Sequence, residues 1–416
     1  MMEYISGYDH KNFGLLGEHL SHSFSPRIHA SLADYPYALY EVERDRLGDW
    51  VKENSLCGYN VTIPYKQEIM KYCDELSPCA EAIGAVNTVV RRSDGTLFGD
   101  NTDYYGFAYM LNLLDVDIKG KKAVVLGGGG ASKTVQAVLS EGGAQVVVVD
   151  LNLENNYDNI HLHFDAELIV NATPVGMYPK TGVSLVNLED FKNCCGVCDV
   201  IYNPAKTALL LQAENMGIPC VNGLSMLVAQ AKRACEIFTD SVISDEVIEK
   251  IRKDIAFSTG NIVLVGMPGC GKSTVGKIIA DTLQRPFKDC DLELTAYAGR
   301  KPSEIIREEG EAKFRKTETE VLSKLCKESG LVIATGGGAV TVEENKDIIR
   351  QNSVVVFMDR DLSLLATDDR PLSVNLPDLY AKRLPLYKEF ADAFVDGNDD
   401  AQTVAENVMN AVSEVL

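Results

Sequence analysis

The stretch GMPGCGKST, residues 266–274, combines residue types and spacing that suit the binding of nucleotide phosphates. It follows the apolar run NIVLV and precedes a segment with apolar residues at helical spacing, which predicts strand, glycine loop and helix. Glycines let backbone N–H groups converge on phosphate oxygens, and a helix N-terminus adds positive potential. We expect Lys272 to reach the β- and γ-phosphates of ATP and Ser273 to contact Mg²⁺. The other expected nucleotide contacts are Gly269, Cys270, Gly271 and Thr274.

Acidic and basic residues after this loop suit phosphoryl transfer to a hydroxyl. All six histidines lie between residues 10 and 163, so the second half of the chain has no histidine base. Asp289 and Asp291 in KDCDLE have strand spacing, which predicts both side chains on one face, one for Mg²⁺ and one to accept a hydroxyl proton. Glu311, Arg315 and Glu318 have helical spacing, which by itself fits a solvated salt-bridge ladder.

The motifs GMPGCGKSTVGK, DCDLE, GEAKFRKTE, TGGGAV, RPL and LYAKRLPLY resemble shikimate kinase in order and spacing across 259–416. The resemblance implies Mg²⁺-dependent transfer of phosphate from ATP to the 3-hydroxyl of shikimate, with Asp291 at the hydroxyl and Asp289 on the metal side. It also implies that Arg315 and Arg383 bind the substrate carboxylate, overriding the ladder interpretation. The resemblance also implies that the ring is lined by Gly336, Gly337 and Gly338. It implies that Arg370 closes over the phosphates on a lid. Ala366 stands where the family often has a further arginine.

A second glycine run lies in KKAVVLGGGGASKTVQAVLSEGGAQVVVVDLN, which predicts strand, loop, helix and strand. Asp150 ends the second strand about 20 residues after the loop, as in dinucleotide-binding folds. An acid at this position hydrogen-bonds a ribose 2′-hydroxyl and repels a 2′-phosphate, which favours NAD over NADP. Ser132 replaces the third glycine of the fingerprint. The expected loop contacts are Gly127, Gly128, Gly129, Gly130 and Ala131.

Proton-transfer chemistry is expected upstream of this loop. In GYNVTIPYK, Asn60 and Thr62 share one face of a short strand, and Pro64 is expected to begin a helix with Lys66 in its first turn. Asp103 in GDNTDYYG begins another predicted helix. A lysine–aspartate pair can move a proton to or from a hydroxyl while hydride leaves or joins its carbon.

The motifs LGEHLSHSFSPRIHA, GYNVTIPYK, AIGAVNTVV, GDNTDYYGF, LGGGGAS, NATPVGM, DVIYNP and NGLSMLVAQA resemble shikimate dehydrogenase in order across 14–235. The resemblance implies reduction of 3-dehydroshikimate to shikimate, with Lys66 and Asp103 as the catalytic pair. The other implied substrate contacts are Ser23, Ser25, Asn60, Thr62, Asn87, Tyr202 and Gln230, and the other cofactor contacts are Asn171, Thr173 and Gly223.

Two features depart from the family near the cofactor. NADP-using members usually carry Asn-Arg-Thr after the second strand, whereas this chain reads DLN from Asp150. Only about twenty residues separate Asp150 from Asn171, so a helix that normally lies there is expected to be shortened or lost. The family therefore suggests NADP, and the residues favour NAD.

Glycine-bounded apolar runs alternate with helical patterns, which predicts an α/β fold with parallel sheets. We expect a substrate-binding domain at 1–110, a Rossmann-like NAD(P) domain at 111–240, a linker at 241–258 and a P-loop kinase domain at 259–416. The chain is expected to return to the first domain near 225–240.

The net charge is −20, from 40 basic and 60 acidic residues, and argues against nucleic-acid and anionic-membrane partners. No apolar run reaches the ~20 residues of a membrane span, no signal peptide is recognised, and eleven cysteines suit a reducing cytoplasm. The expected ligands are 3-dehydroshikimate, shikimate, a nicotinamide cofactor, ATP and Mg²⁺. Two alternatives stay open for the front half: a dehydrogenase-like binding module, or an NAD-preferring quinate/shikimate dehydrogenase.

Overall fold

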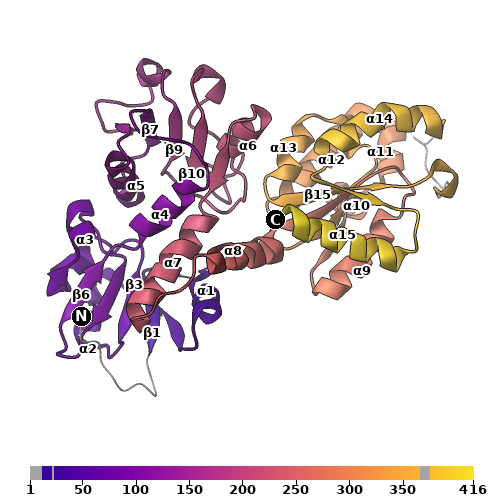
Figure 1. The fold of residues 1–416 in the computed structure, drawn as a ribbon. Coiled ribbons are helices and arrows are strands. Elements are labelled where there is room, and N and C mark those ends of the chain that lie inside the picture. The colour runs from indigo at the N-terminus through magenta and orange to yellow at the C-terminus, as the bar shows by residue number, and fades with distance from the viewer. Residues whose placement is uncertain (1–11, 21–22, 366–374) are drawn as a thin grey trace. The chain divides into compact units, whose positions relative to one another are not determined.

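The structure, a computed structural model, describes residues 12–20, 23–365 and 375–416. The chain forms two compact units (Figure 1). The first holds the described residues up to Val175 together with Leu185–Tyr202 and Gln212–Arg252, and the second holds Gly176–Ser184, Asn203–Leu211 and Lys253–Leu416. No described helix is both long and apolar enough to cross a bilayer.

A mixed sheet with the order β2-β1-β3-β5-β6-β4 begins the first unit. Its strands are β1 (Phe13–Gly17), β2 (Tyr37–Glu41), β3 (Gly58–Val61), β4 (Glu75–Leu76), β5 (Thr88–Arg91) and β6 (Leu97–Asp100). Strand β1 runs parallel to β2 and β3, whereas β5 is antiparallel to β3 and β6. The helices among these strands are α1 (Ser25–Leu32), α2 (Leu47–Glu53) and α3 (Pro78–Ile83), with 3₁₀ turns at Arg44–Arg46 and Glu68–Tyr72.

The same unit contains a parallel sheet with the order β11-β10-β9-β7-β8. Its strands are β7 (Lys122–Leu126), β8 (Gln145–Val149), β9 (Leu168–Asn171), β10 (Gly196–Asp199) and β11 (Cys220–Asn222). Helix α5 (Gly130–Glu141) joins β7 to β8, and α6 (Ala208–Asn215), which contains residues of both units, precedes β11. Between β8 and β9 the described chain forms only a 3₁₀ turn at Ile160–His163, which confirms the expectation that a helix there is shortened or lost. A 3₁₀ turn at Leu188–Asp190 lies between β9 and β10.

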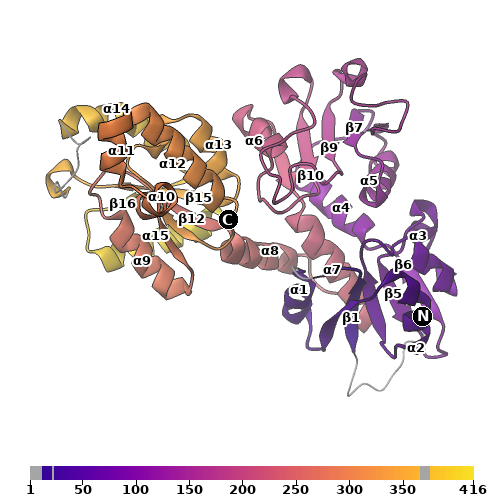
Figure 2. The same cartoon turned by 180° about the vertical axis from the view of Figure 1, so that it is seen from behind.

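Helices α4 (Asp103–Asn112) and α7 (Leu224–Thr239) pack side by side in the first unit (Figures 1 and 2). The C-terminal half of α7 also covers the mixed sheet, where Phe238 stacks on Phe13 with ring centroids 4.6 Å apart. Because α4 begins directly after β6, this packing connects the mixed sheet to the core beneath the parallel sheet. The start of α4 is therefore held by both α7 and β6.

The second unit is built on a parallel sheet with the order β13-β14-β12-β15-β16. The strands are β12 (Asn261–Val265), β13 (Phe287–Asp289), β14 (Val332–Ala334), β15 (Ser353–Asp359) and β16 (Ala393–Asp396). The helices are α9 (Lys272–Leu283), α10 (Cys290–Ala298), α11 (Pro302–Glu309), α12 (Glu311–Leu325), α13 (Glu344–Arg350), α14 (Leu376–Phe390) and α15 (Ala401–Val415). Helix α8 (Glu246–Thr259) contains residues of both units, and 3₁₀ turns occur at Ala339–Thr341 and Leu362–Leu364.

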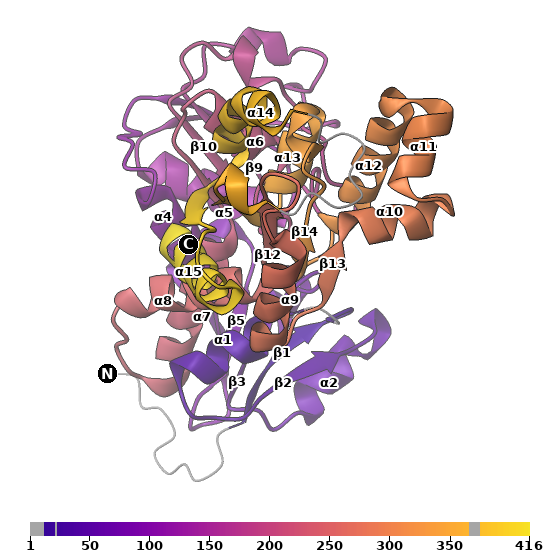
Figure 3. The ribbon, with the colours of Figure 1, turned by 90° about the vertical axis from the view of Figure 1, so that its right-hand side faces the viewer.

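Strands β12, β14 and β15 are almost wholly buried, as expected for a parallel sheet with helices on both faces. Helices α9 and α15 pack together, as do α12 and α13 (Figure 3). The predicted α/β class, with a Rossmann-like sheet followed by a P-loop sheet, is therefore observed. In both parallel sheets the glycine loops follow a strand and precede a helix, which puts them at the strands' carboxyl ends, where α/β proteins bind ligands.

Candidate active sites

The proposed acid–base pair is in direct contact. The Nζ atom of Lys66 lies 2.6 Å from Oδ2 of Asp103, and the two side chains are 27% and 13% exposed. Asp103 is the first residue of α4, as the sequence predicts. Lys66 does not lie in a helix: it occupies a turn between β3 and the 3₁₀ turn at Glu68–Tyr72, so that expectation was wrong. A partly buried but accessible ion pair of this kind can exchange a proton with a bound hydroxyl.

A hydrogen-bond network holds the start of α4. Oδ1 of Asn87 accepts a hydrogen bond from the backbone N–H of Thr102 at 2.7 Å, and the Thr88 hydroxyl lies 3.1 Å from the same oxygen. Asn60 donates from Nδ2 to the Thr88 hydroxyl and to the Asn87 carbonyl. These four residues are buried, so the network fixes the backbone directly before Asp103.

The other residues implied in substrate binding follow neighbouring strands. Ser23 and Ser25 come after β1, and Thr62 comes after β3, which pairs with β1 in parallel. Ser23 accepts a hydrogen bond from the N–H of Ser25. Gln230 lies on α7 against Gly106 of α4, where a Cβ would meet the Gln230 Cβ at 3.0 Å. Gln230 therefore lies about one helical turn from Asp103.

The dinucleotide loop has the shape expected of a phosphate cradle. Gly127 has φ +101°, and a Cβ there would lie 2.6 Å from the Thr173 side chain, so a larger residue would not fit. Positions Gly129 and Gly130 face open space. The N–H of Gly128 donates to Oδ2 of Asp150 at 2.8 Å, which places this carboxylate beside the loop. Ala131 follows in the first turn of α5.

Polar residues at the ends of β9 and β10 complete this edge of the sheet. Asn171 donates from Nδ2 to both carboxylate oxygens of buried Asp199 at 3.1 Å and accepts from the Thr173 hydroxyl at 2.7 Å. Gly223 caps α7 so tightly that a Cβ would lie 2.0 Å from the Val200 carbonyl oxygen. Tyr202 is partly buried, which raises its pKa, and its ring lies 6.0 Å from that of Phe24. The loop, Asp150 and these residues fit a bound dinucleotide.

The P-loop of the second unit surrounds the Lys272 side chain. Its Nζ atom donates to the carbonyls of Gly266 and Met267, both at 2.9 Å. Gly269 and Gly271 have φ +86° and +97°, so the turn requires glycine at both. Cys270 is fully buried behind the loop and offers no side chain to the pocket. Thr274 lines the pocket beside Ser273.

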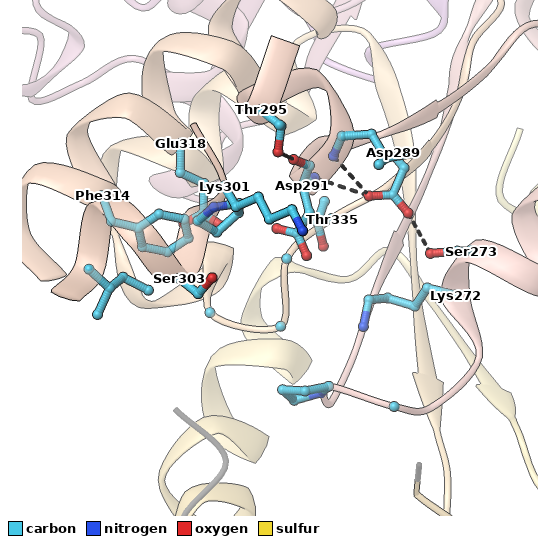
Figure 4. Close-up of a pocket in the computed structure, with 18 of the residues that line it drawn as sticks. Lys272, Ser273, Asp289, Asp291, Thr295, Lys301, Ser303, Phe314, Glu318 and Thr335 are labelled. Atoms are coloured by element: carbon cyan, nitrogen blue, oxygen red, sulfur yellow. Dashed lines mark hydrogen bonds between the residues drawn. The ribbon is translucent and has the colours of Figure 1, made fainter. Parts of the chain in front are cut away.

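Asp289 and Asp291 approach the P-loop from different elements (Figure 4). Asp289 ends β13 and caps α10, accepting the N–H of Asp291, and its Oδ2 accepts the Ser273 hydroxyl at 2.6 Å. Asp291 is already in α10, so the predicted strand spacing was wrong, although both residues line one pocket. The Ser273 and Asp289 oxygens form a hard donor pair that suits Mg²⁺, which takes its other ligands from water and phosphates.

Arg315 and Arg383 both lie beside the triple-glycine segment. Arg315 forms the ladder with Glu311 at 3.1 Å and Glu318 at 2.7 Å, but its side chain is only 12% exposed and lines the pocket. Arg383 is buried and donates to the Gly337 carbonyl at 3.1 Å. From the sequence, a salt-bridge ladder and a substrate-binding site are competing interpretations of Arg315. In the structure Arg315 forms the ladder and also lines the pocket.

The three glycines are required because side chains crowd them. A Cβ on Gly336 would lie 2.5 Å from Oε1 of Glu318, and one on Gly338 would lie 2.2 Å from the Arg315 guanidinium. Gly337 packs on Pro268 of the P-loop. Burial raises the pKa of Glu318, against the opposing effect of Arg315, and its Oε1 is buried without a partner in the described chain.

One pocket of about 1100 Å³ joins these groups in the second unit. Sequence reasoning missed several of its residues, including Lys301, Ser303 and Thr335. The Lys301 side chain extends into it from the start of α11 (Figure 4). Arg360, after β15, was also missed: its Nη1 lies 3.5 Å from where a Cβ on Gly271 would be. No local motif marks Lys301, Ser303 or Arg360, whereas the TGGG run does mark Thr335. The expected lid residue Arg370, like Ala366, lies outside the described residues.

Comparisons with known proteins identify both units. The model of the shikimate dehydrogenase substrate binding domain matches residues 15–89, and the shikimate kinase model matches residues 268–413. A shikimate dehydrogenase (NADP(+)) of Clostridium beijerinckii is 38% identical over 258 residues, which are 57% of this chain and 95% of the relative.

Two solved structures resemble the front part of the chain. A chorismate mutase/shikimate 5-dehydrogenase fusion protein from Clostridium acetobutylicum has a TM-score of 0.56 at 38% identity, over 60% of this chain and 98% of that one. Shikimate 5-dehydrogenase from Listeria monocytogenes, in complex with shikimate and NAD, has a TM-score of 0.53 at 32% identity, over 60% and 99% of the two chains. The chain therefore belongs to the shikimate dehydrogenase family, and the match of its C-terminal part to shikimate kinase makes it an oxidoreductase joined to a phosphotransferase.

Proposed function

We propose that the chain catalyses two successive reactions: reduction of 3-dehydroshikimate to shikimate, and phosphorylation of the shikimate 3-hydroxyl. The product of the first reaction is the substrate of the second. The contact between Lys66 and Asp103 supports the first reaction, and the pocket that joins the P-loop to Asp291 and Arg315 supports the second.

In the first reaction, the glycine loop and Asp150 would hold a reduced nicotinamide cofactor, which would supply hydride to the carbonyl carbon. Lys66 and Asp103 supply the proton that the carbonyl oxygen needs, and the hydroxyl of shikimate forms there. Asn87 and Gln230 orient the ring hydroxyls, and Ser23, Ser25 and Thr62 bind the carboxylate.

We propose NAD as the cofactor that fits best, although the relatives are named for NADP(+). The Asp150 carboxylate lies against the glycine loop, where it accepts the N–H of Gly128. The 2′-phosphate of NADP beside this carboxylate would meet like charge, whereas the ribose 2′-hydroxyl of NAD would donate a hydrogen bond to it. The complex of the Listeria monocytogenes enzyme with NAD supports this choice.

In the second reaction, Asp291 accepts the proton of the attacking 3-hydroxyl. Lys272 moves from its loop carbonyls to the phosphates and balances the charge that develops during transfer. Ser273 and Asp289 would hold Mg²⁺, which neutralises the phosphates when bound. Arg315 and Arg383 bind the carboxylate of shikimate, with the glycine segment against the ring.

A coupled assay tests both reactions on the intact chain. With 3-dehydroshikimate, reduced cofactor, ATP and Mg²⁺, we expect cofactor oxidation followed by formation of shikimate 3-phosphate. The Asp291→Asn variant should still reduce 3-dehydroshikimate but accumulate shikimate. If the wild-type chain phosphorylates added shikimate yet never oxidises or reduces either substrate, the front half is a binding module and this part of the proposal fails.

A further inference from the structure

The short segment between β8 and β9 lies beside the proposed cofactor site, and neither proposed reaction explains its sequence. It runs from Asp150 to His163 as DLNLENNYDNIHLH and contains only a 3₁₀ turn at Ile160–His163. The segment holds no lysine or arginine and two further acids, Glu154 and Asp158. It therefore offers no fixed positive charge of the kind that accommodates the 2′-phosphate of NADP.

Backbone groups hold Asp150 on several sides. Its carboxylate accepts the N–H of Gly128 on Oδ2 at 2.8 Å and the N–H of Asn152 on Oδ1 at 3.3 Å. Its own N–H donates to the Asn155 carbonyl at 3.1 Å, and its carbonyl accepts the N–H of Leu153 at 3.2 Å. The chain thus turns back on Asp150, so the position of Asn155 affects the backbone from which the carboxylate projects.

Asn155 is in turn bonded to His163 at the end of the segment. The Nε2 atom of His163 lies 3.1 Å from Oδ1 of Asn155, and both residues are partly buried. An amide oxygen only accepts, so Nε2 carries a hydrogen and donates it. The Nδ1 atom of His163 is buried without a partner in the described chain, so the hydrogen bonding of this ring depends on Asn155.

His163 is well placed to hold the turn because the chain beside it is packed. Phe164 follows directly, and its ring meets that of buried Phe191 edge-on with centroids 5.2 Å apart. The His163 carbonyl accepts the N–H of Ala166, two residues before β9. The bond to Asn155 therefore connects the turn at Asp150 to the chain that leads into the parallel sheet.

Asparagine side chains order the rest of the segment. Oδ1 of Asn159 accepts the N–H of Asn156 at 2.8 Å, and its Nδ2 donates to the Glu154 carbonyl at 2.8 Å. Such side-chain bonds pair backbone groups that a helix would otherwise pair. Both neighbours of Asn155 are thereby bonded to Asn159, which fixes how Asn155 faces His163.

We infer that His163 is a positioning residue for cofactor choice: by holding Asn155 it maintains the turn that fixes the Asp150 carboxylate against the glycine loop. The inference rests on the proposed role of Asp150 in binding NAD. Without the His163 donor, the turn would loosen and the carboxylate would lose its defined position. A less ordered carboxylate would bind the ribose 2′-hydroxyl of NAD less well and repel the 2′-phosphate of NADP less, so discrimination between them would fall.

Substitutions in the full chain test this role. The readout is the ratio of kcat/KM for NAD to kcat/KM for NADP in shikimate oxidation. We expect His163→Phe, which removes the donor, to lower this ratio about tenfold, and His163→Gln, which retains a donor near the Nε2 position, to lower it less than about threefold. His161→Phe, at an exposed position two residues earlier, is the matched control and should leave the ratio unchanged. KM for shikimate and the kinase rate should not change in any of these variants.

An Asp150→Asn background tests whether His163 acts through Asp150. In this background His163→Phe should not change the ratio further, because the charge that His163 positions has already been removed. A further decrease of the ratio there would show that His163 acts independently of Asp150, and it would overturn the inference.

A purely structural role of His163 predicts a different pattern. It would lower the melting temperature and reduce kcat/KM equally with both cofactors, so that the wild-type ratio survives in His163→Phe, and this result would also overturn the inference. If His163→Phe does not fold, Asn155→Ala removes the acceptor of the same bond and should show the same tenfold decrease, about one hydrogen bond's effect on each cofactor. A wild-type chain that prefers NADP would instead contradict the proposed cofactor itself.

Discussion

The Nζ atom of Lys66 lies 2.6 Å from Oδ2 of Asp103, although the two residues come from separate elements of the first unit. Lys66 lies in the turn after β3, and Asp103 begins α4. Asn87 connects the segment before Lys66 to the segment before Asp103. Its carbonyl accepts the N–H of Val61, and its side chain accepts the N–H of Thr102. The pair is therefore fixed by the sheet and not only by its own attraction.

Removing either charge of this pair should abolish most dehydrogenase turnover. For Lys66→Met and for Asp103→Asn we expect kcat to fall about 10²- to 10⁴-fold, the usual contribution of general acid–base catalysis. KM for the cofactor should change little. Steady-state rates of shikimate oxidation measure the loss, and the melting curve of each variant is the folding control, since the kinase rate reports only on the other unit. Full dehydrogenase activity in Lys66→Met would mean that another group transfers the proton.

The charge of Asp150 should determine the choice of cofactor. We expect the wild-type chain to have a higher kcat/KM with NAD than with NADP, and Asp150→Asn to lower the value with NAD about tenfold while raising that with NADP. Asparagine retains an acceptor for the Gly128 N–H, so the loop is preserved while the charge is removed. Asn152→Ala, two residues further along, is the matched control. A wild-type preference for NADP would contradict this interpretation of Asp150.

The sequence predicts the two glycine loops because they are local patterns: apolar strand, glycines, then a helix starting at Gly130 or Lys272. It misplaces Asp291 because the Asp289 side chain accepts the N–H groups of Asp291 and Leu292, and this cap begins a helix where strand spacing was expected.

Long-range contacts made by residues outside the recognised motifs could not be predicted from the sequence. The Tyr37 hydroxyl donates to Oδ1 of Asn60, 23 positions away in the chain, and Arg360 is 89 positions from Gly271. Nothing near either residue in the sequence indicates its partner, since the sheets bring them together. The side chains that occupy motifs were therefore found, whereas those that support them from other strands were not.

An ion-pair network on α7 should give the dehydrogenase unit a defined pH dependence. Burial by itself raises the pKa of Glu236, but the Ile243 N–H and the ion pairs with Lys232 and Arg233 outweigh it and lower the pKa. A carboxyl with a lowered folded pKa stabilises the fold above its unfolded value of 4.5, and this contribution is lost as pH falls through the folded pKa.

Glu236→Gln should therefore destabilise the first unit by about 1.5 kcal/mol near neutral pH, because the buried Lys232 charge loses one of its two carboxylate partners and keeps Asp245. The difference in stability between Glu236→Gln and the wild type should shrink below pH 4.5. Thermal inactivation of the dehydrogenase, followed as a function of pH, measures it. A difference that stays constant into the acid range would contradict the role assigned to the Glu236 charge.

Crowding at Gly338 should make this position sensitive to a single methyl group. A Cβ there would lie 2.2 Å from the Arg315 guanidinium, so Gly338→Ala must displace that side chain. We expect KM for shikimate in the kinase reaction to rise about tenfold with KM for ATP unchanged. Arg315→Ala should give a similar rise, and the double variant should be no worse than the single ones, since both remove one contact. Additive effects would mean that Gly338 acts independently of Arg315.

Arg360 should contribute to nucleotide binding. Its Nη1 lies beside Gly271 of the P-loop, its Nε is buried without a partner, and none of the described carboxylates forms an ion pair with it. A guanidinium that pairs with no carboxylate of the described residues and lies next to a phosphate-binding loop is suited to an anionic nucleotide. We expect Arg360→Ala to raise KM for ATP about tenfold and to leave KM for shikimate unchanged. Arg307→Ala, which removes an exposed arginine paired with Glu308, is the matched control and should change neither value. An unchanged KM for ATP in Arg360→Ala would show that the nucleotide does not use this charge.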